Sequence, residues 1–174
     1  MSSVFRADGA ATSFADVYSA HHRRAVRLAW LLTGDPHAAE DVVAEAFAKV
    51  WRQWERGRVR DVGPYLRRAV VNQVNSRGRR RALEIREGER RAGDERGVRL
   101  HDEQAADHDA VWQALQRLPD RQRAAIVLRY YEDLSEAQAA EMLGVSVGTV
   151  KSQVSRGLDR LRELLGDATA FGGA

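Results

Sequence analysis

"LGVSVGTVKSQVSRGLDRL", residues 143–161, decides the fold because two different patterns run through it. Five aliphatic residues recur at steps of three and four, which places them along one side of a helix. The other side carries short hydroxyl side chains and one arginine. We therefore expect an apolar side that holds the helix on its domain and a polar side of small hydrogen-bonding groups. The aliphatic residues are Val147, Val150, Val154, Leu158 and Leu161, and the polar ones are Thr149, Ser152, Ser155 and Arg156.

The residues before this helix predict a second, shorter helix and a tight turn. Ser135 and Gln138 have the spacing of a capping box, in which two side chains satisfy the first free backbone groups of a helix. Gly144 stands where that helix has to end in a left-handed residue, and Ser146 is suited to cap the helix that follows. Residues 135–157 are therefore predicted to form a helix-turn-helix, whose second helix enters the major groove of DNA.

The chemistry of the polar side favours DNA over plain solvent. Small side chains let the backbone approach the groove closely, and Arg156 can reach guanine O6 and N7 or a phosphate. Lys151 lies at the edge of this side, and Arg129 is available to a phosphate on the flank. The alternative is an amphipathic bundle helix with a solvated face, but such a face usually carries Glu and Lys rather than Thr and Ser.

Composition agrees with a nucleic-acid partner without requiring one. The chain has 174 residues, enough for one domain or two small ones, and 28 Lys and Arg, of which only Lys49 and Lys151 are lysines. Arginine binds phosphate bidentately, although a coding bias toward Arg explains the same count. The absence of cysteine excludes disulfides and thiol chemistry. No apolar run approaches the roughly 20 residues of a membrane span, and we expect a cytoplasmic protein.

Periodicity along the whole chain predicts an all-α fold made of two small helical domains. Helical patterns run from residue 14 into the arginine-rich stretch near residue 81 and again from residue 109. Between them, charged and small residues dominate and cannot contribute a core, so we expect a flexible linker there, with a solvated helix as the alternative. The predicted divisions are an N-terminal tail at 1–13, a first domain at 14–84, the linker at 85–108, a second domain at 109–166 and a tail at 167–174.

No constellation for catalysis or metal binding emerges. His37 and Glu40 are three residues apart, and two carboxylates follow them, but a di-metal bundle needs matching Glu-x-x-His sets on other helices, and the sequence has none. A phosphate-cradling glycine loop and a nucleophile motif are also missing. We therefore predict that the chain is not an enzyme and that it needs no metal or cofactor.

Two long stretches resemble one protein family. "LPDRQRAAIVLRYYEDLSEAQAAEMLGVSVGTVKSQVSRGLDRL", residues 118–161, resembles region four of the sigma-70 family in its small extracytoplasmic-function class. "DPHAAEDVVAEAFAKVWRQW", residues 35–54, resembles region two, and "PYLRRAVVNQVNSRGRRR", residues 64–81, resembles the part that opens the promoter. The matches stand in the family's order and cover most of the chain. The resemblance implies a sigma factor that binds core RNA polymerase and directs promoter-specific initiation.

The resemblance also assigns DNA contacts to the two regions. Region four is expected to read the minus-thirty-five element as duplex. Region two is expected to melt the minus-ten element and hold it as a single strand. Aromatic side chains on which unpaired bases stack, with cations beside them, are suited to hold such a strand. Tyr65 stands where the family often has Trp, and Gly78 interrupts the basic run, so both depart from the family pattern. The implied duplex contacts are Arg129, Ser146, Thr149, Lys151, Ser152, Ser155 and Arg156, and the implied strand contacts are Tyr65, Arg68, Asn72, Asn75, Arg77, Arg79, Arg80 and Arg81.

Partners follow from the same resemblance. The outward face of the helix at 37–54 would dock on the clamp helices of the polymerase β′ subunit, and region four would contact the β flap. From the residues alone this face is a solvated charged face. Promoter DNA is the second partner, an anti-sigma factor is left open as a third, and no membrane insertion is expected. The predicted polymerase contacts are Asp41, Glu45, Lys49 and Arg52.

Two other classes of protein remain open from the residues. One is a homodimeric helix-turn-helix repressor or activator that binds palindromic duplex DNA, and the other is a helical adaptor that binds only protein. The N-terminal domain separates the first from a sigma factor. A repressor needs a ligand pocket or a dimer seam there, not a basic helix that carries an asparagine.

Overall fold

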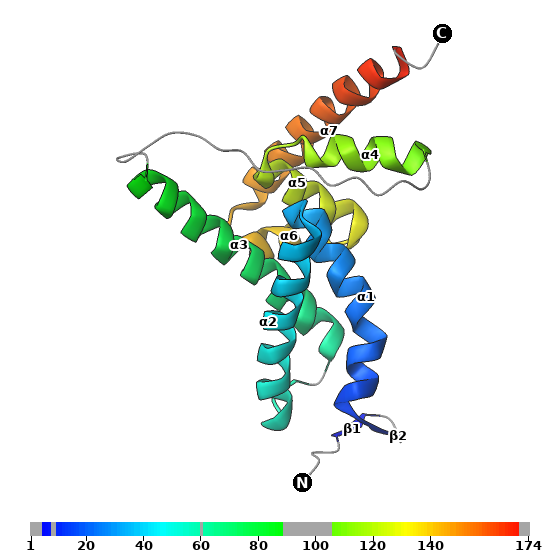
Figure 1. The fold of residues 1–174 in the computed structure, drawn as a ribbon, viewed down its shortest axis with the longest axis vertical. Coiled ribbons are helices and arrows are strands. Elements are labelled where there is room, and N and C mark those ends of the chain that lie inside the picture. The colour runs from blue at the N-terminus through cyan, green and yellow to red at the C-terminus, as the bar shows by residue number, and fades with distance from the viewer. Residues whose placement is uncertain (1–4, 8–9, 60, 89–105, 171–174) are drawn as a thin grey trace.

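The computed structural model describes residues 5–7, 10–59, 61–88 and 106–170. Helices make up nearly all of these residues (Figure 1), so the predicted all-α class is confirmed. Within the described ranges, no helix is long and apolar enough to cross a membrane. In chain order, the helices are α1 (Phe14–Thr33), α2 (Pro36–Glu55), α3 (Val62–Gly88), α4 (Ala106–Gln116), α5 (Asp120–Ile126), the π-helical turn η1 (Val127–Tyr131), α6 (Glu136–Leu143) and α7 (Val147–Ala170).

A short hairpin precedes the helices and differs from the predicted tail. Strands β1 (Phe5–Ala7) and β2 (Ala10–Thr12) pair antiparallel, with Phe5 opposite Thr12. Each strand has only three residues, which is too short for the alternation of apolar and polar positions that identifies a strand in a sequence.

Helices α1, α2 and α3 pack against one another, and local signals fix where the first two begin and end. Ser13 and Asp16 form a capping box at the start of α1. Gly34 ends α1 in the left-handed conformation, with φ of 72°, and its N–H donates to the Trp30 carbonyl. Asp35 then caps α2, in which Pro36 occupies the first turn, where its missing N–H costs nothing. Gly34 and Pro36 therefore define the turn between these two helices.

The helix-turn-helix predicted at 135–157 is confirmed in its local details. Ser135 and Gln138 form the expected capping box at the start of α6, and Gly144 ends this helix with φ of 67°. Ser146 caps α7 by accepting from the Thr149 N–H at 3.1 Å. The predicted apolar stripe is wrong at one residue, because Val147 is 40 % exposed. The buried part of the stripe begins at Val150. Val147 is the first residue of α7.

Gly157 brings α7 unusually close to α5. A Cβ atom at this position would lie 2.6 Å from Ile126 Cδ1 and 3.3 Å from Gln122 Cβ. Glycine in a helix interior costs about 1 kcal/mol relative to alanine. Here part of that cost is offset because an added side chain would force the Ile126 side chain to shift.

The two predicted domains share one continuous core. It joins Leu32 and Val71 of the first part to Leu128, Ala140 and Val150 of the second. In Figure 1, α6 lies against α3, and α5 lies beside the C-terminal end of α1. We use "first part" for α1–α3 and "second part" for α4–α7.

The helix bounds differ from the predicted domain limits. Helix α3 continues past residue 84 to Gly88, α4 begins at Ala106 within the predicted linker, and α7 continues past residue 166. The rest of the predicted linker, 89–105, lies outside the described residues, as does the end of the predicted C-terminal tail. The division into two domains stays a prediction.

Candidate nucleic-acid interface

The polar side of α7 presents small groups first and a cation later. The Ser146 hydroxyl lies 2.9 Å from Thr149 Oγ1, and Ser152 donates to the Thr149 carbonyl at 2.9 Å. These bonds keep the hydroxyl groups close to the helix backbone. Ser155 and Arg156 are exposed further along. Side chains near the start of α7 therefore extend only a short way from the helix backbone, whereas Arg156 further along is long and exposed.

Lys151 and Arg129, the other two predicted duplex contacts, take part in contacts within the second part. Lys151 Nζ lies 3.5 Å from Glu136 Oε2 on α6. Arg129 donates to the Leu134 carbonyl and so helps to hold the turn before α6. Lys151 remains largely exposed, so a phosphate can replace the exposed carboxylate at little cost.

Helix α3 gathers most of the predicted strand contacts on one face. Tyr65, Arg68, Asn72, Asn75 and Arg79 follow one another at steps of three, four, three and four, which aligns them along the helix. We call this row the α3 stripe. All but Asn75 are exposed. Arg80 is exposed beside the row, and the side chain of Arg81 lies outside the described residues.

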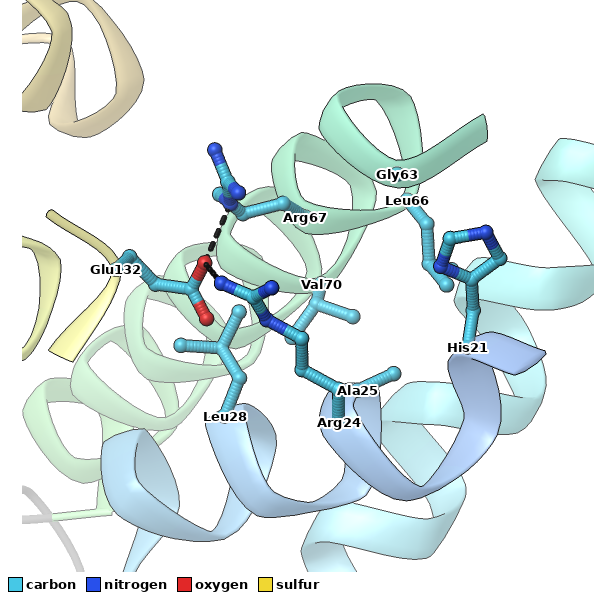
Figure 2. Close-up of a pocket in the computed structure, with 9 residues that line it drawn as sticks. All are labelled: His21, Arg24, Ala25, Leu28, Gly63, Leu66, Arg67, Val70 and Glu132. Atoms are coloured by element: carbon cyan, nitrogen blue, oxygen red, sulfur yellow. Dashed lines mark hydrogen bonds and ion pairs between the residues drawn. The ribbon is translucent and has the colours of Figure 1, made fainter. Parts of the chain in front are cut away.

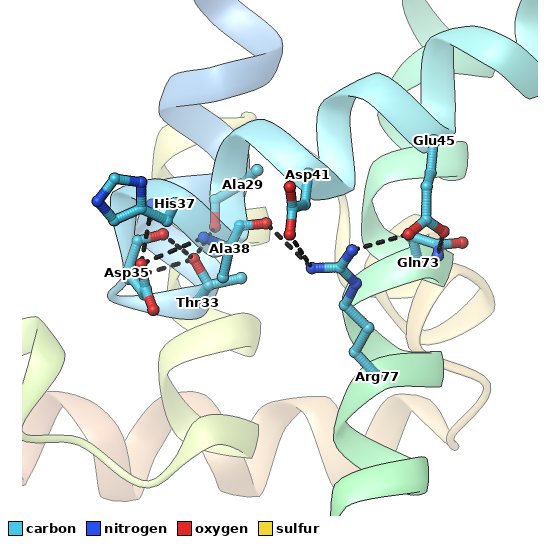
Figure 3. A network of polar contacts seen from close by, with 9 residues as sticks. All are labelled: Ala29, Thr33, Asp35, His37, Ala38, Asp41, Glu45, Gln73 and Arg77. Carbon is cyan, nitrogen blue, oxygen red and sulfur yellow. Dashed lines mark hydrogen bonds and ion pairs between the residues drawn. The ribbon is translucent and has the colours of Figure 1, made fainter. Parts of the chain in front are cut away.

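Arg77 lies on a different face of α3 and contacts α2 instead (Figure 3). Its guanidinium reaches Glu45 at 2.7 Å, Asp41 at 3.6 Å and the Ala38 carbonyl at 3.4 Å. The structure therefore joins a predicted strand contact to two predicted polymerase contacts. Lys49, a third predicted polymerase contact, donates to Gln73, which donates to Glu45. The fourth, Arg52, is exposed.

The electrostatics of this cluster are centred on Glu45. The hydrogen bond from Arg77 lowers the pKa of Glu45 most. Partial burial raises this pKa, whereas the positive charges of Arg77 and Lys49 and a hydrogen bond from Gln73 lower it further. The carboxylate therefore stays charged at neutral pH and fixes α3 against α2.

The α3 stripe faces the second part of the chain. Arg68 pairs with Glu141 of α6 at 2.9 Å. Asn75 and Arg79 line a groove of about 520 Å³, whose opposite wall includes Thr149 at the start of α7. Thr149 of the predicted duplex-binding face thus lies across a groove from Asn75 and Arg79 of the α3 stripe.

Sequence reasoning did not identify the buried charges between the two parts. The Glu132 side chain, at the end of η1, is 1 % exposed, and its Oε2 lies 3.1 Å from Arg24 Nη2 and 2.6 Å from Arg67 Nε (Figure 2). Arg123 of α5 is also buried and donates two bonds to the Leu32 carbonyl, at 2.9 and 3.2 Å. The available signal was a charged residue, Glu132, directly after the largely apolar run at 126–131.

Aromatic side chains add to the same contact. The rings of Trp30 and Trp112 lie 5.6 Å apart, and the Arg27 guanidinium lies over both Trp112 and Tyr131. Among the residues whose side chains are described, no three His, Asp or Glu come together as a metal site would require.

Comparisons with known proteins agree on one family. The chain matches the families described as "Sigma-70 region 2" over residues 17–84 and "Sigma-70, region 4" over residues 108–161. It is 35 % identical over 162 residues to the RNA polymerase sigma-E factor of Streptomyces antibioticus, covering 91 % of this chain and 88 % of that protein. It is 30 % identical to the ECF RNA polymerase sigma factor SigW of Bacillus subtilis, covering 89 % and 90 %.

A solved structure has the same arrangement of helices. The sigma factor RpoE of Bartonella quintana, in complex with the anti-sigma factor NepR, superimposes with a TM-score of 0.68 at 26 % identity. The match covers 88 % of this chain and 96 % of that one.

Proposed function

The chain belongs to the sigma-70 family of RNA polymerase sigma factors, in the extracytoplasmic-function class, and on that premise we propose how its two parts share promoter recognition. The second part reads upstream duplex with α7, and the first part holds the unpaired downstream strand with the α3 stripe. The observation that carries this proposal is that one chain has both surfaces, a row of small groups on a helix-turn-helix and a row of aromatic, amide and arginine groups on α3.

The duplex role of α7 is supported by its shape and charge. A backbone lined by Ser146, Thr149 and Ser152 can lie deep in a major groove, and Arg156 is free to form a bidentate contact with guanine or a bond to phosphate. Lys151 and Arg129 supply further cations on the flanks. They can bind the phosphates that fix the register of the helix.

The strand role of α3 is supported by the order of groups along it. Tyr65 offers a ring on which an unpaired base can stack, Asn72 offers an amide for base edges, and Arg68 and Arg79 offer charge to the backbone. Arg77 is better explained as a positioning residue that holds α2, since its guanidinium faces Asp41 and Glu45.

The polymerase contact is proposed for the exposed face of α2. Asp41, Glu45, Lys49 and Arg52 lie on that face, and three of them are held in place from α3. In this function the chain is an initiation factor without catalytic activity, because the polymerase carries out the chemistry. An anti-sigma factor, such as the one bound to the Bartonella relative, is a further proposed partner. Location in the cytoplasm stays a prediction.

Reconstituted transcription tests the proposal. The purified chain should give specific initiation from a promoter when it is added to core polymerase, whereas core polymerase alone should not. A dimer that binds two symmetric half-sites tightly without polymerase would instead indicate a conventional repressor or activator.

Two substitutions separate the roles of the two surfaces. Arg156→Ala should weaken upstream recognition by about 1–3 kcal/mol if the side chain contacts a base, and an equal loss on all sequences would mark a phosphate contact. Arg160→Ala, which removes an exposed arginine one turn further along α7, is the matched control.

Asn72→Ala should leave upstream binding intact and impair opening of the promoter duplex. Permanganate footprinting of unpaired thymines measures this opening.

A further inference from the structure

The contact between the two parts contains a pair of arginines whose partner comes from the other part. Building on the function proposed above, we propose that Arg24 and Arg67 form a binding site for a backbone phosphate of the unpaired promoter strand. Glu132 occupies this site as an internal anion while the two parts are packed together. The carboxylate and the strand therefore compete for the same two guanidinium groups.

The geometry is that of a built anion site. Arg24 comes from α1 and Arg67 from α3, and both reach the same oxygen of Glu132 (Figure 2). A small pocket of about 80 Å³, lined also by His21, lies beside them. The Arg67 side chain is 21 % exposed and that of Arg24 is 61 % exposed. Only the Glu132 side chain is fully withdrawn from water.

The charges in this site do not balance. Two guanidinium groups face a single carboxylate, and the other oxygen, Oε1, has no hydrogen-bond partner among the described residues. A phosphate offers more acceptor oxygens than this carboxylate uses, and paired arginines bind phosphate with charge-assisted bonds. A backbone phosphodiester carries the same single charge as the carboxylate, but its two free oxygens can accept from the two guanidinium groups separately, whereas Glu132 presents one oxygen to both.

The position of the site fits a strand held on α3. Arg67 is the neighbour of Arg68 in the chain and lies about 100° around α3 from it, to one side of the row that would contact the bases. The sugar–phosphate backbone of a strand runs beside its bases, and we place it on the Arg67 side of α3. Because Glu132 of the second part lies between the two guanidinium groups, a strand phosphate can bridge both of them only if Glu132 moves away. Strand binding and separation of the two parts are thus linked.

Binding of an oligo(dT) strand to the full chain, measured by fluorescence anisotropy without polymerase, tests this linkage. Glu132→Gln removes the competing charge and should bind the strand about tenfold more tightly at low salt, because one phosphate contact is gained. The slope of log affinity against log salt should steepen by about 0.7 for the same reason. Glu163→Gln makes the same change in net charge at an exposed ion pair on α7 and should leave both quantities unchanged.

A distance measurement reports the separation itself. The chain has no cysteine, so spin labels can be placed at exposed alanines with Ala48→Cys on α2 and Ala137→Cys on α6. Addition of the strand should lengthen the distance between them, and Glu132→Gln should lengthen it before any strand is added. Adding Arg24→Gln and Arg67→Gln to Glu132→Gln should return strand affinity to that of the unaltered chain.

Several results would overturn the phosphate site. One is equal strand affinity and equal salt slope for Glu132→Gln and the unaltered chain. Another is a gain in affinity for core polymerase without a gain for the strand, because the arginine pair would then accept an acidic protein group. If Glu132→Gln does not fold, Glu132→Asp retains the charge but withdraws it from the arginines, and its strand affinity should lie above that of the unaltered chain. Promoter-directed transcription by the unaltered chain decides the proposed function separately, because the strand measurements contain no polymerase.

Discussion

Two clusters of arginine and glutamate hold this molecule together, and they differ in where they lie. One joins the two parts of the chain, with Glu132 between Arg24 and Arg67 (Figure 2). The other lies within the first part, with Arg77 against Glu45 and Asp41 (Figure 3). The Glu132 side chain is 1 % exposed, whereas that of Glu45 is 49 % exposed.

This difference in burial gives similar contacts different consequences. An exposed ion pair contributes little, because water hydrates both partners when the pair breaks. A buried carboxylate cannot be hydrated in place, so removing its partner leaves an uncompensated charge. The packing of the two parts should therefore depend on the arginines around Glu132 far more than the packing of α2 on α3 depends on Arg77.

The largest effect is expected from Arg67→Gln. It leaves the buried Glu132 carboxylate with Arg24 alone and should lower the free energy of unfolding by about 3 kcal/mol. Arg77→Gln, the same substitution in the exposed cluster, should cost less than about 1 kcal/mol. Urea unfolding at neutral pH, followed by circular dichroism, measures both. Equal costs for the two variants would show that burial does not separate the clusters.

A smaller effect is expected at Arg123, a buried arginine that contacts buried main chain and an exposed carboxylate. Arg123 donates two bonds to the Leu32 carbonyl, and its carboxylate partner, Asp120, is exposed. Arg123→Lys loses the planar fork and should cost about 2 kcal/mol in the same assay, the range for hydrogen bonds that involve a charged group. Asp120→Asn is the control and should cost less than about 1 kcal/mol. A larger cost for Asp120→Asn would place the anchoring in the ion pair.

The sequence predicted those features whose causes are local. The capping box of Ser135 and Gln138, the left-handed Gly144 and the cap at Ser146 each depend on a few neighbouring residues, and all three are confirmed. The prediction that Val147 is buried was wrong because periodicity assigns a residue to a side of a helix. It does not say how much of that side the neighbouring helices cover.

Features that depend on distant residues were not predicted. Nothing near Glu132 in the chain indicates that Arg24 and Arg67 will surround it, because both partners belong to the other part. Arg77 was grouped with the strand contacts as part of a basic run. Its actual face on α3, which is set by three- and four-residue steps, directs it to α2. The predicted DNA contacts stay predictions, since their test requires the partner.

The smallest effect, and the one that best isolates the exposed cluster, is the pH dependence at Glu45. The hydrogen bond from Arg77 lowers the pKa of this carboxyl in the folded chain below its usual value of 4.5. A lowered pKa contributes stability that is present above the unfolded value and is lost as the pH falls through the folded one. Glu45→Gln should therefore be less stable than the unaltered chain at neutral pH, and the difference should vanish as the solution is acidified below about pH 4.5. Paired urea titrations across that range measure it, with Glu163→Gln as the control for an exposed carboxylate. A difference that persists in strong acid would mean that Glu45 stabilises α2 and α3 by packing and not by its charge.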